Sequence, residues 1–197
     1  MWNDIKTLFD ELIIPDEYLD TIYSVDFNHL KSLGISGLLL DLDNTLVGRY
    51  EDEPSLKCRS WIDAAKLAGF RLCISSNSFY PNRVRNIAES LQVPAFFVAV
   101  KPLPWALNVA AKNILKLPPS QVALIGDQLF TDVLGGNLAN MHTILVDPME
   151  KERFTAKKLV RLLEKSALKS CGISMVEGSI LGYRTKRNRR EIVNEYH

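Results

Sequence analysis

LLLDLDNTLVG, residues 38–48, carries three leucines directly into two aspartates that stand one residue apart. Such an apolar run is typical of a strand that is buried on both faces of a parallel sheet. Aspartate is among the poorest strand formers, and a carboxylate at the end of a buried strand is costly unless it is paired or binds a ligand. The stretch therefore predicts a central strand whose end, Asp41 and Asp43, has a chemical role.

The remaining sequence alternates strand-like and helix-like segments. Apolar runs predict strands at 37–43, 70–76, 95–100, 121–127 and 142–148. Helical spacing, with proline or glycine at several ends, predicts helices at 55–69, 81–93, 104–117 and 130–141. A further helix is expected within 15–36, packed against the sheet. This alternation indicates an α/β fold, a three-layer doubly wound and mainly parallel sheet.

Composition narrows the class of protein. The chain has 197 residues and is 47% hydrophobic, so it can bury a full core, which argues against global disorder. Its three cysteines, Cys58, Cys73 and Cys171, form no C-x-x-C pair, which argues against a disulfide framework or a structural zinc site. They are interpreted as small buried side chains. The acidic N-terminus has no long apolar run, so we expect a cytoplasmic protein without a signal peptide or membrane span.

Charge divides the chain into two parts. Residues 1–150 hold 12 Lys and Arg against 18 Asp and Glu, whereas residues 151–197 hold 12 against 5. We therefore expect 1–150 to form the catalytic core with an N-terminal helical extension, and 151–197 to form a basic helix and tail of the same domain. The basic segment 151–190 favours contact with a polyanion, which is an anionic membrane, nucleic acid or an acidic partner, or else it is a solvated helix and tail.

Polar residues follow the predicted strands at their carboxyl ends, where ligands bind in an open α/β sheet. They are Asp41, Asp43, Ser76, Asn77, Lys101, Asp127 and Asp132. Carboxylates suit Mg²⁺ and can also act as nucleophile or as general acid and base. A lysine and a hydroxyl can hold phosphoryl oxygens. The set therefore predicts phosphoryl transfer.

Four short motifs, in this order, give the resemblance: DLDNT (41–45), SN (76–77), KP (101–102) and GDQLFTD (126–132). They resemble the motifs of the haloacid dehalogenase (HAD) phosphatases, which have a Rossmann-like fold. The flanks, PDEYLDTI and IGDQLFTDVLGGNLANMHTILVDP, resemble the YqeG-type branch of HAD subclass IIIA, which is similar to the phosphatidylglycerophosphate phosphatases. The resemblance implies a Mg²⁺-dependent phosphomonoester hydrolase that works through an aspartyl-phosphate.

The first two motifs imply roles in catalysis and phosphate binding. Asp41 matches the nucleophile, and Asp43 matches the general acid and base, whose main-chain carbonyl also binds the metal. Thr45 resembles the residue that steadies the loop around the acid and base. Ser76 matches the phosphate-binding hydroxyl and Asn77 the amide beside it.

The last two motifs imply a phosphate-neutralising lysine and the remainder of a metal site. Lys101 matches the lysine that neutralises nucleophile and phosphate. Asp127 matches a Mg²⁺ ligand and completes the metal set of Asp41, Asp43 and Asp127. Asp132 is expected to orient a metal-bound water or Lys101. Gly126 is expected to allow a close backbone approach.

The spacing of the motifs leaves no room for an inserted cap domain, because Thr45 and Ser76 lie 31 positions apart and Ser76 and Lys101 lie 25 apart. An open site suits a phosphate on a large partner, and phosphatidylglycerophosphate is the first choice of substrate. The basic segment would then hold the enzyme at the membrane periphery.

Two alternatives stay open. One is the same chemistry on a soluble phosphosugar, nucleotide or phosphoprotein, and the other is a nucleic-acid- or ribosome-associated protein with incidental hydrolysis. A receiver domain fits the D-x-D-x-T motif badly.

Overall fold

The computed structural model describes residues 12–97 and 101–149, and their strands form one six-stranded parallel sheet. The sheet order is β1-β6-β5-β2-β3-β4. The strands are β1 (Glu17–Leu19), β2 (Gly37–Leu40), β3 (Arg71–Ser76), β4 (Ala95–Phe97), β5 (Val122–Gly126) and β6 (His142–Val146). The predicted parallel sheet is therefore confirmed, and the strand that carries LLL lies inside it with partners on both sides.

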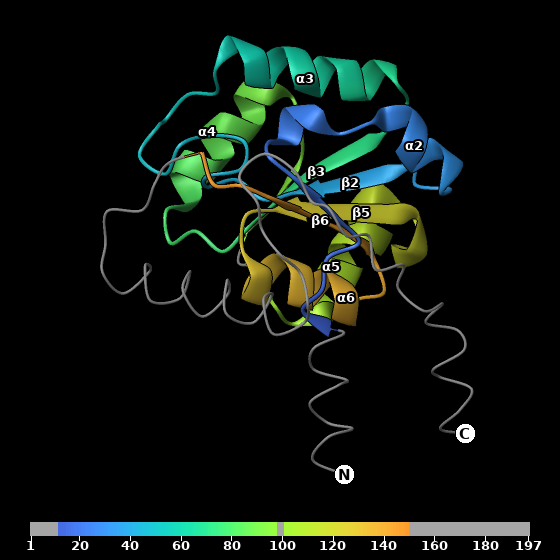
Figure 1. Ribbon diagram of the computed structural model, residues 1–197. Helices are drawn as coiled ribbons and strands as arrows, with labels where there is room; N and C mark the ends of the chain where they lie inside the picture. Colours follow the sequence, from blue (N-terminus) through green and yellow to red (C-terminus); the bar gives the residue numbers. More distant parts are fainter. Residues whose placement is uncertain (1–11, 98–100, 150–197) are drawn as a thin grey trace, which may run out of the picture.

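Helices cover both faces of the sheet, which confirms the predicted three layers (Figure 1). One face carries α2 (Phe27–Ser32), α3 (Leu56–Leu67) and α4 (Pro81–Leu91), and the other carries α5 (Pro104–Val109) and α6 (Leu134–Leu138). Two predicted helices differ in detail. α5 continues as a π-helical segment, η2 (Ala110–Leu115), and α6 is preceded by another, η4 (Leu129–Val133). Two short 3₁₀ turns complete the described elements, η1 (Ile22–Ser24) and η3 (Pro119–Gln121).

The central strand shows why its sequence is apolar throughout. All four residues of β2 are buried. Leu38 and Leu40 belong to the core on the α2–α3–α4 side, whereas Leu39 belongs to the core beneath α5 and η2. Because successive side chains of a strand point to opposite faces, a strand with helices on both sides must be apolar at every position.

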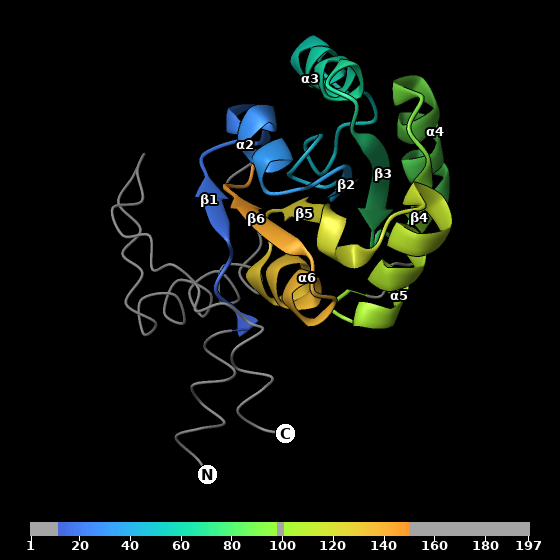
Figure 2. The same ribbon diagram turned by 90° about the vertical axis from the view of Figure 1, so that its right-hand side faces the viewer.

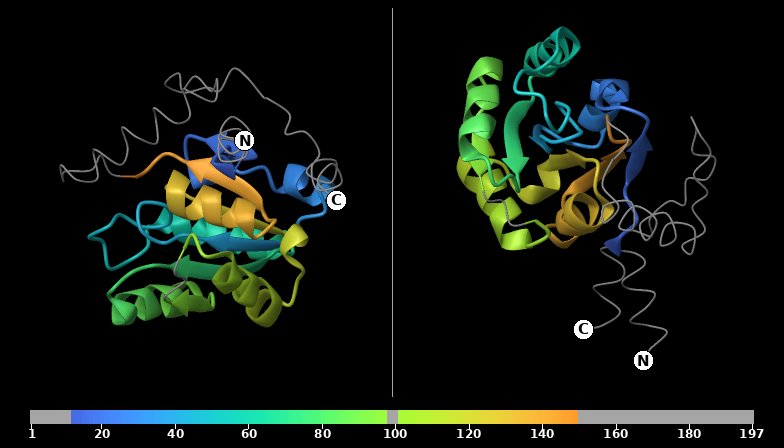
Figure 3. Two further views of the ribbon diagram at one scale, coloured as in Figure 1. Left: turned by 90° about the horizontal axis from the view of Figure 1, so that it is seen from below. Right: turned by 90° about the vertical axis from the view of Figure 1, so that its left-hand side faces the viewer.

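The N-terminal extension differs from the sequence-based expectation. It contains the predicted helix, α2, whose N-cap Asp26 accepts hydrogen bonds from the backbone of Asn28 and His29. It also contains a strand that was not predicted, β1, which pairs with β6 at the edge of the sheet (Figures 2 and 3). Three residues are too few to show an alternating pattern, so the pairing depends on tertiary contacts: the Asp16 amide donates to Thr143 O at 2.9 Å.

Between the motif-bearing strands, the described residues contain no inserted domain. The segment from Thr45 to Ser76 holds a loop, α3 and β3, and the described part that follows holds α4 and β4. This confirms the expected capless core. The predicted basic helix and tail at 151–197 lie outside the described residues. Within 12–97 and 101–149 no helix has the length and apolar character needed to cross a bilayer.

Candidate active site

The first two aspartates diverge because the chain turns sharply after Asp41. The Asp41 amide still pairs with Ile125 O of β5 at 2.9 Å, so its side chain remains at the end of the sheet and is buried. Beyond it, the amides of Leu46 and Val47 both donate to Leu42 O, which closes a tight turn. The turn places Asp43 in a half-buried position, outside the core.

Lys101 lies at the centre of the site. Its ammonium group donates to Asp41 Oδ1 at 2.5 Å, to Asp132 Oδ1 at 2.7 Å and to Ser75 O at 3.0 Å. The main chain of Lys101 is also held, because its amide donates to Asn77 Oδ1 at 3.0 Å and Asn77 Nδ2 donates back to Lys101 O at 3.1 Å. The second and third motifs are therefore joined directly.

The fourth motif contributes two buried carboxylates. Asp127 directly follows β5, and Asp132 lies in η4. One carboxylate oxygen from each of Asp41, Asp127 and Asp132 lies within 4.8 Å of the others. Gly126 makes this possible, because a Cβ at that position would lie 2.3 Å from the Asp132 carboxyl carbon. Asp132 Oδ2 also accepts from the Gln128 amide at 3.1 Å.

Burial and charge oppose each other in this cluster. Burial raises the pKa of Asp41 well above its usual range, Lys101 opposes the rise, and Asp132 and Asp127 add to it. For Lys101, burial favours the neutral amine, but the carboxylates of Asp132 and Asp41 outweigh it and raise the pKa above its usual value. Three clustered carboxylates against one ammonium group leave an excess of negative charge, which a cation would neutralise.

The cluster fits a hard divalent cation. Mg²⁺ prefers oxygen ligands and takes one or two carboxylates together with water and phosphate. Asp41 Oδ2 is buried and has no hydrogen-bond partner among the described residues, so it is available as a ligand or nucleophile. The clustered carboxylates are those of Asp41, Asp127 and Asp132, whereas the metal set expected from the sequence was Asp41, Asp43 and Asp127. The two sets are compatible, because Asp43 was expected to bind the metal through its main-chain carbonyl and not through its carboxylate.

The remaining motif residues surround this cluster. Ser76 ends β3 and is buried, and its hydroxyl accepts from the Ser78 amide at 3.1 Å. The hydroxyl of Thr45 is buried and has no hydrogen-bond partner in the described ranges. The structure therefore brings all predicted site residues to the carboxyl edge of the sheet, with Asp43 set apart from the carboxylate cluster.

Arg83 is a site residue that the sequence reasoning missed. It lies in the first turn of α4, and its Nη1 donates to Asp43 Oδ1 at 2.7 Å. Its Nη2 donates to Gly48 O at 3.0 Å and to Glu51 O at 2.6 Å. Arg83 belongs to no motif, and most of its partners are main-chain oxygens, so the sequence carries no signal for these contacts.

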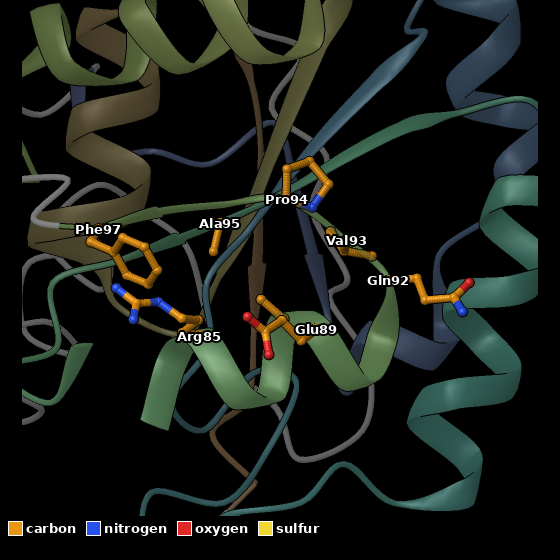
Figure 4. Close-up of a pocket in the computed structure, with 8 residues that line it drawn as sticks. Arg85, Glu89, Gln92, Val93, Pro94, Ala95 and Phe97 are labelled. Atoms are coloured by element: carbon orange, nitrogen blue, oxygen red, sulfur yellow. The ribbon is translucent and has the colours of Figure 1, made fainter. Parts of the chain in front are cut away.

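A separate pocket of about 370 Å³ lies between α4 and β4 (Figure 4). Its lining includes Arg85, Glu89 and Phe97, and the Arg85 guanidinium lies 6.0 Å from the centre of the Phe97 ring. None of the motif residues lines it. The chemistry-bearing groups therefore lie outside this pocket, at the end of the sheet.

Three comparisons place the chain among known proteins. A family described as HAD-hydrolase-like matches residues 98–158. "Probable phosphatase YqeG" of Bacillus subtilis is 34% identical over 168 residues, which are 84% of this chain and 96% of that protein. Phosphatidylglycerophosphate phosphatase 1 of Arabidopsis thaliana is 24% identical over 169 residues, 81% of this chain; the chain spans about half, 48%, of that longer protein.

Among solved structures, the cobalt-bound deoxy-D-mannose-octulosonate 8-phosphate phosphatase (YrbI) of Haemophilus influenzae aligns over 73% of this chain and 93% of that chain. The TM-score is 0.47 and the identity 16%. Family membership depends instead on the similarity to the Bacillus protein, which covers most of both sequences, and on the four motifs gathered at one sheet edge. This chain belongs to the HAD-like phosphatases, in the family of the YqeG protein.

Proposed function

We propose that this phosphatase hydrolyses phosphomonoesters through a covalent phosphate on Asp41. The observation that carries the proposal is the state of the Asp41 carboxylate. Lys101 binds one oxygen at 2.5 Å, and the other is buried without a hydrogen-bond partner among the described residues. A carboxylate held in this way has one oxygen fixed and one available for attack on phosphorus.

The reaction proceeds in two steps. In the first, an oxygen of Asp41 bonds to phosphorus, the bond from phosphorus to the alcohol oxygen breaks, and Asp43 gives that oxygen a proton. In the second, Asp43 takes a proton from water, the water oxygen bonds to phosphorus, and the bond from phosphorus to Asp41 breaks. Inorganic phosphate and free Asp41 result, so Asp43 ends in the state in which it began.

The other site residues hold the phosphoryl group and the metal. Lys101 neutralises the anionic oxygens, and the Ser76 hydroxyl is available to donate to one of them. Asn77 acts indirectly, by positioning Lys101, because both the oxygen and the nitrogen of its amide bind the main chain of Lys101. Mg²⁺ would be held by Asp41, Asp127 and the Asp43 carbonyl, and it would neutralise charge on the transferring phosphoryl group.

We further propose an amphiphilic substrate, phosphatidylglycerophosphate. All four exposed aromatic side chains of the described residues lie on segments at the catalytic edge: Tyr50, Phe79, Tyr80 and Trp105. We call these four residues the aromatic rim. They lie on the segments that follow β2, β3 and β4, whose carboxyl ends share that edge. Aromatic rings of this kind suit the boundary between lipid and water.

Hydrogen bonds from two side chains to the main chain connect the segments that carry the aromatic rim. Arg83 binds the main chain on either side of Tyr50, at Gly48 and Glu51. Asn77 binds the main chain of Lys101, which joins the segment of Phe79 and Tyr80 to that of Trp105. A capless site with an apolar border admits a phosphate whose alcohol lies in a lipid surface. The name of the Arabidopsis relative also supports this substrate.

The chemistry is tested with Asp41→Asn, since an amide has nearly the same shape but cannot attack phosphorus. We expect the variant to be folded, which a thermal unfolding curve checks. With Mg²⁺ present, it should lose turnover of a soluble alkyl phosphate and of phosphatidylglycerophosphate in mixed micelles. Turnover comparable with that of the wild type would contradict the role of Asp41. Turnover by the wild type of soluble phosphates alone would contradict the lipid substrate and favour the soluble alternative.

The lipid surface is tested with Phe79→Ser and Tyr80→Ser, both at exposed positions. Burying one such ring contributes about 1.5–3 kcal/mol, so hydrolysis of the substrate in vesicles should fall roughly tenfold or more at limiting lipid. Hydrolysis of a soluble phosphate should not change. Leu67→Ser is the matched control, because Leu67 is 89% exposed at the end of α3, away from the catalytic edge. Equal effects of all three variants would contradict the lipid surface.

A further inference from the structure

The guanidinium group of Arg83 lies between the side chain of Asp43 and the loop that follows the first motif. Its Nη1 donates to Asp43 Oδ1 at 2.7 Å, its Nη2 to Gly48 O and Glu51 O, and its Nε to Glu51 O at 3.0 Å. Asp52 adds an ion pair with Nε at 3.4 Å, but its side chain is 85% exposed. Arg83 therefore has partners on both sides, one in the reaction centre and the others in the loop.

These contacts fix the plane of the guanidinium group. Arginine presents its donors in a rigid fork, and here all three nitrogens are used. The fork is shielded, since the side chain of Arg83 is 13% exposed and that of Asp43 is 21% exposed. A charge-assisted hydrogen bond in such surroundings is about twice as strong as a neutral one. The orientation of the Asp43 carboxyl group is thus set from α4 and not by its own loop alone.

The contact with Arg83 also makes the two carboxylate oxygens of Asp43 unequal. Oδ1 accepts from Arg83, whereas no hydrogen bond to Oδ2 is formed within the described residues. Oδ2 is the oxygen better suited to carry the proton that passes to an alcohol oxygen, because the cationic Arg83 N–H stabilises negative charge on Oδ1. The geometry therefore separates a held oxygen from a reactive one, as the Lys101 contact does for Asp41.

We propose that Arg83 is a positioning residue for the proton transfer performed by Asp43. The inference depends on the proposed role of Asp43 as general acid and base. Arg83 holds Oδ1, so that Oδ2 gives its proton to the leaving oxygen as the bond to phosphorus breaks. Through Gly48 and Glu51 the same side chain holds the loop, so the loop and the acid are positioned together.

A purely structural role for Arg83 would have a different signature. Loss of a loop anchor would lower stability and would slow all substrates alike. Loss of a positioned acid slows only substrates whose leaving group needs a proton. An alkoxide is a poor leaving group and needs one, whereas p-nitrophenolate leaves readily without it. The ratio of the two rates therefore distinguishes positioning from general structural support.

The test compares release of the leaving group in a single turnover from an alkyl phosphate and from p-nitrophenyl phosphate. In Arg83→Gln the first rate should fall roughly 10²-fold, the usual contribution of a positioned acid, while the second changes little. Arg83→Lys retains the charge but not the fork, so it should lie between the two. Arg85→Gln is the matched control, on the same helix two positions further, and should affect neither rate.

Asp43→Asn tests the acid itself, separately from its positioning by Arg83. If it shows the same selective loss and Arg83→Gln does not, the positioning role is overturned while the function of Asp43 stands. If Asp43→Asn shows no selective loss, the proposed acid itself is overturned. Where both show it, Arg83→Gln in the Asp43→Asn background should add no further loss, because the acid that it positions is already absent. Full additivity in that double variant would overturn the inference. Arg83→Lys keeps the test valid if Arg83→Gln does not fold.

Discussion

Gly126→Ala adds one methyl group at the most crowded point of the site. The new Cβ would lie 2.3 Å from the carboxyl carbon and from Oδ2 of Asp132, and 2.8 Å from its Cβ. A carbon atom requires about 3.4 Å in ordinary van der Waals contact. The Asp132 side chain must therefore move by roughly 1 Å, because it cannot share that space.

The displacement disturbs the contact between Asp132 and the catalytic lysine. Asp132 Oδ1 lies 2.7 Å from Lys101 Nζ, and a shift of about 1 Å in the carboxyl group spoils the length or the angle of this hydrogen bond. Misplacement by about 1 Å costs roughly 10²-fold in rate, and we expect this loss in kcat for a soluble phosphate. The free energy of unfolding should fall by less than the roughly 3–5 kcal/mol of a fully broken buried ion pair, because Lys101 keeps Asp41 and Ser75 O.

Gly136→Ala supplies the control for crowding alone. Its Cβ would lie 2.6 Å from Thr143 Cγ2 and 3.1 Å from Leu124 Cδ2, so its nearest neighbours belong to the core beneath β5 and β6 and not to the carboxylate cluster. We expect it to lose stability but to retain kcat. Kinetics and chemical denaturation of both variants measure the two effects separately. If Gly126→Ala retains kcat, or if Gly136→Ala loses as much, the account of how Asp132 is positioned is refuted.

Three further predictions address the metal, the thiols and the C-terminal segment. Activity should require Mg²⁺, disappear in chelator and be poorly supported by Ca²⁺, which prefers more ligands at longer distances; full activity in chelator would argue against the metal. Burial raises the pKa of Cys58 to about 11 and of Cys73 to about 12, so both thiols stay protonated at pH 8. They should resist iodoacetamide until the protein unfolds, and rapid labelling of either in the native protein would be inconsistent with this. A chain truncated after Gly182 should keep its rate on a soluble phosphate but lose binding to anionic vesicles. The loss should be clearest at low salt, because at physiological ionic strength screening already limits the reach of these charges to ~8 Å. Unchanged vesicle binding would remove the argument from charge.

The centre of the sheet could be predicted because its strands β2 and β5 are buried throughout. Apolar runs such as 37–43 and 121–127 leave little choice of structure, and parallel pairing follows from the helices between them. The edge strand β1 escaped prediction because it has three half-buried residues and a register fixed by β6. The π-helical segments escaped for a related reason, since a local sequence pattern does not specify how a helix ends against its neighbours.

The site could be predicted to the level of its motifs. Parallel strands end at one edge, so Asp41, Lys101 and Asp127 were expected to meet, and they lie close together. Asp41 and Asp43 alternate with one residue between, which in a continuing strand would place them on one face. Instead β2 ends at Leu40, and the turn that Leu42 O closes sets Asp43 apart from the carboxylate cluster. Arg83 could not be found in the same way, because its contacts with main-chain oxygens leave no residue-type signature.

The central claim is that phosphate passes through Asp41, and a trapped intermediate tests it most directly. An acyl phosphate is reduced by borohydride, whereas a free carboxylate is not, so quenching during turnover and reducing should convert the phosphorylated residue to homoserine. Peptide mass spectrometry should then find homoserine at Asp41 in the wild type, dependent on substrate and Mg²⁺, and none in Asp41→Asn. Homoserine at Asp43 or Asp127 instead, or an unmodified Asp41 in an enzyme that is turning over, would contradict the claim.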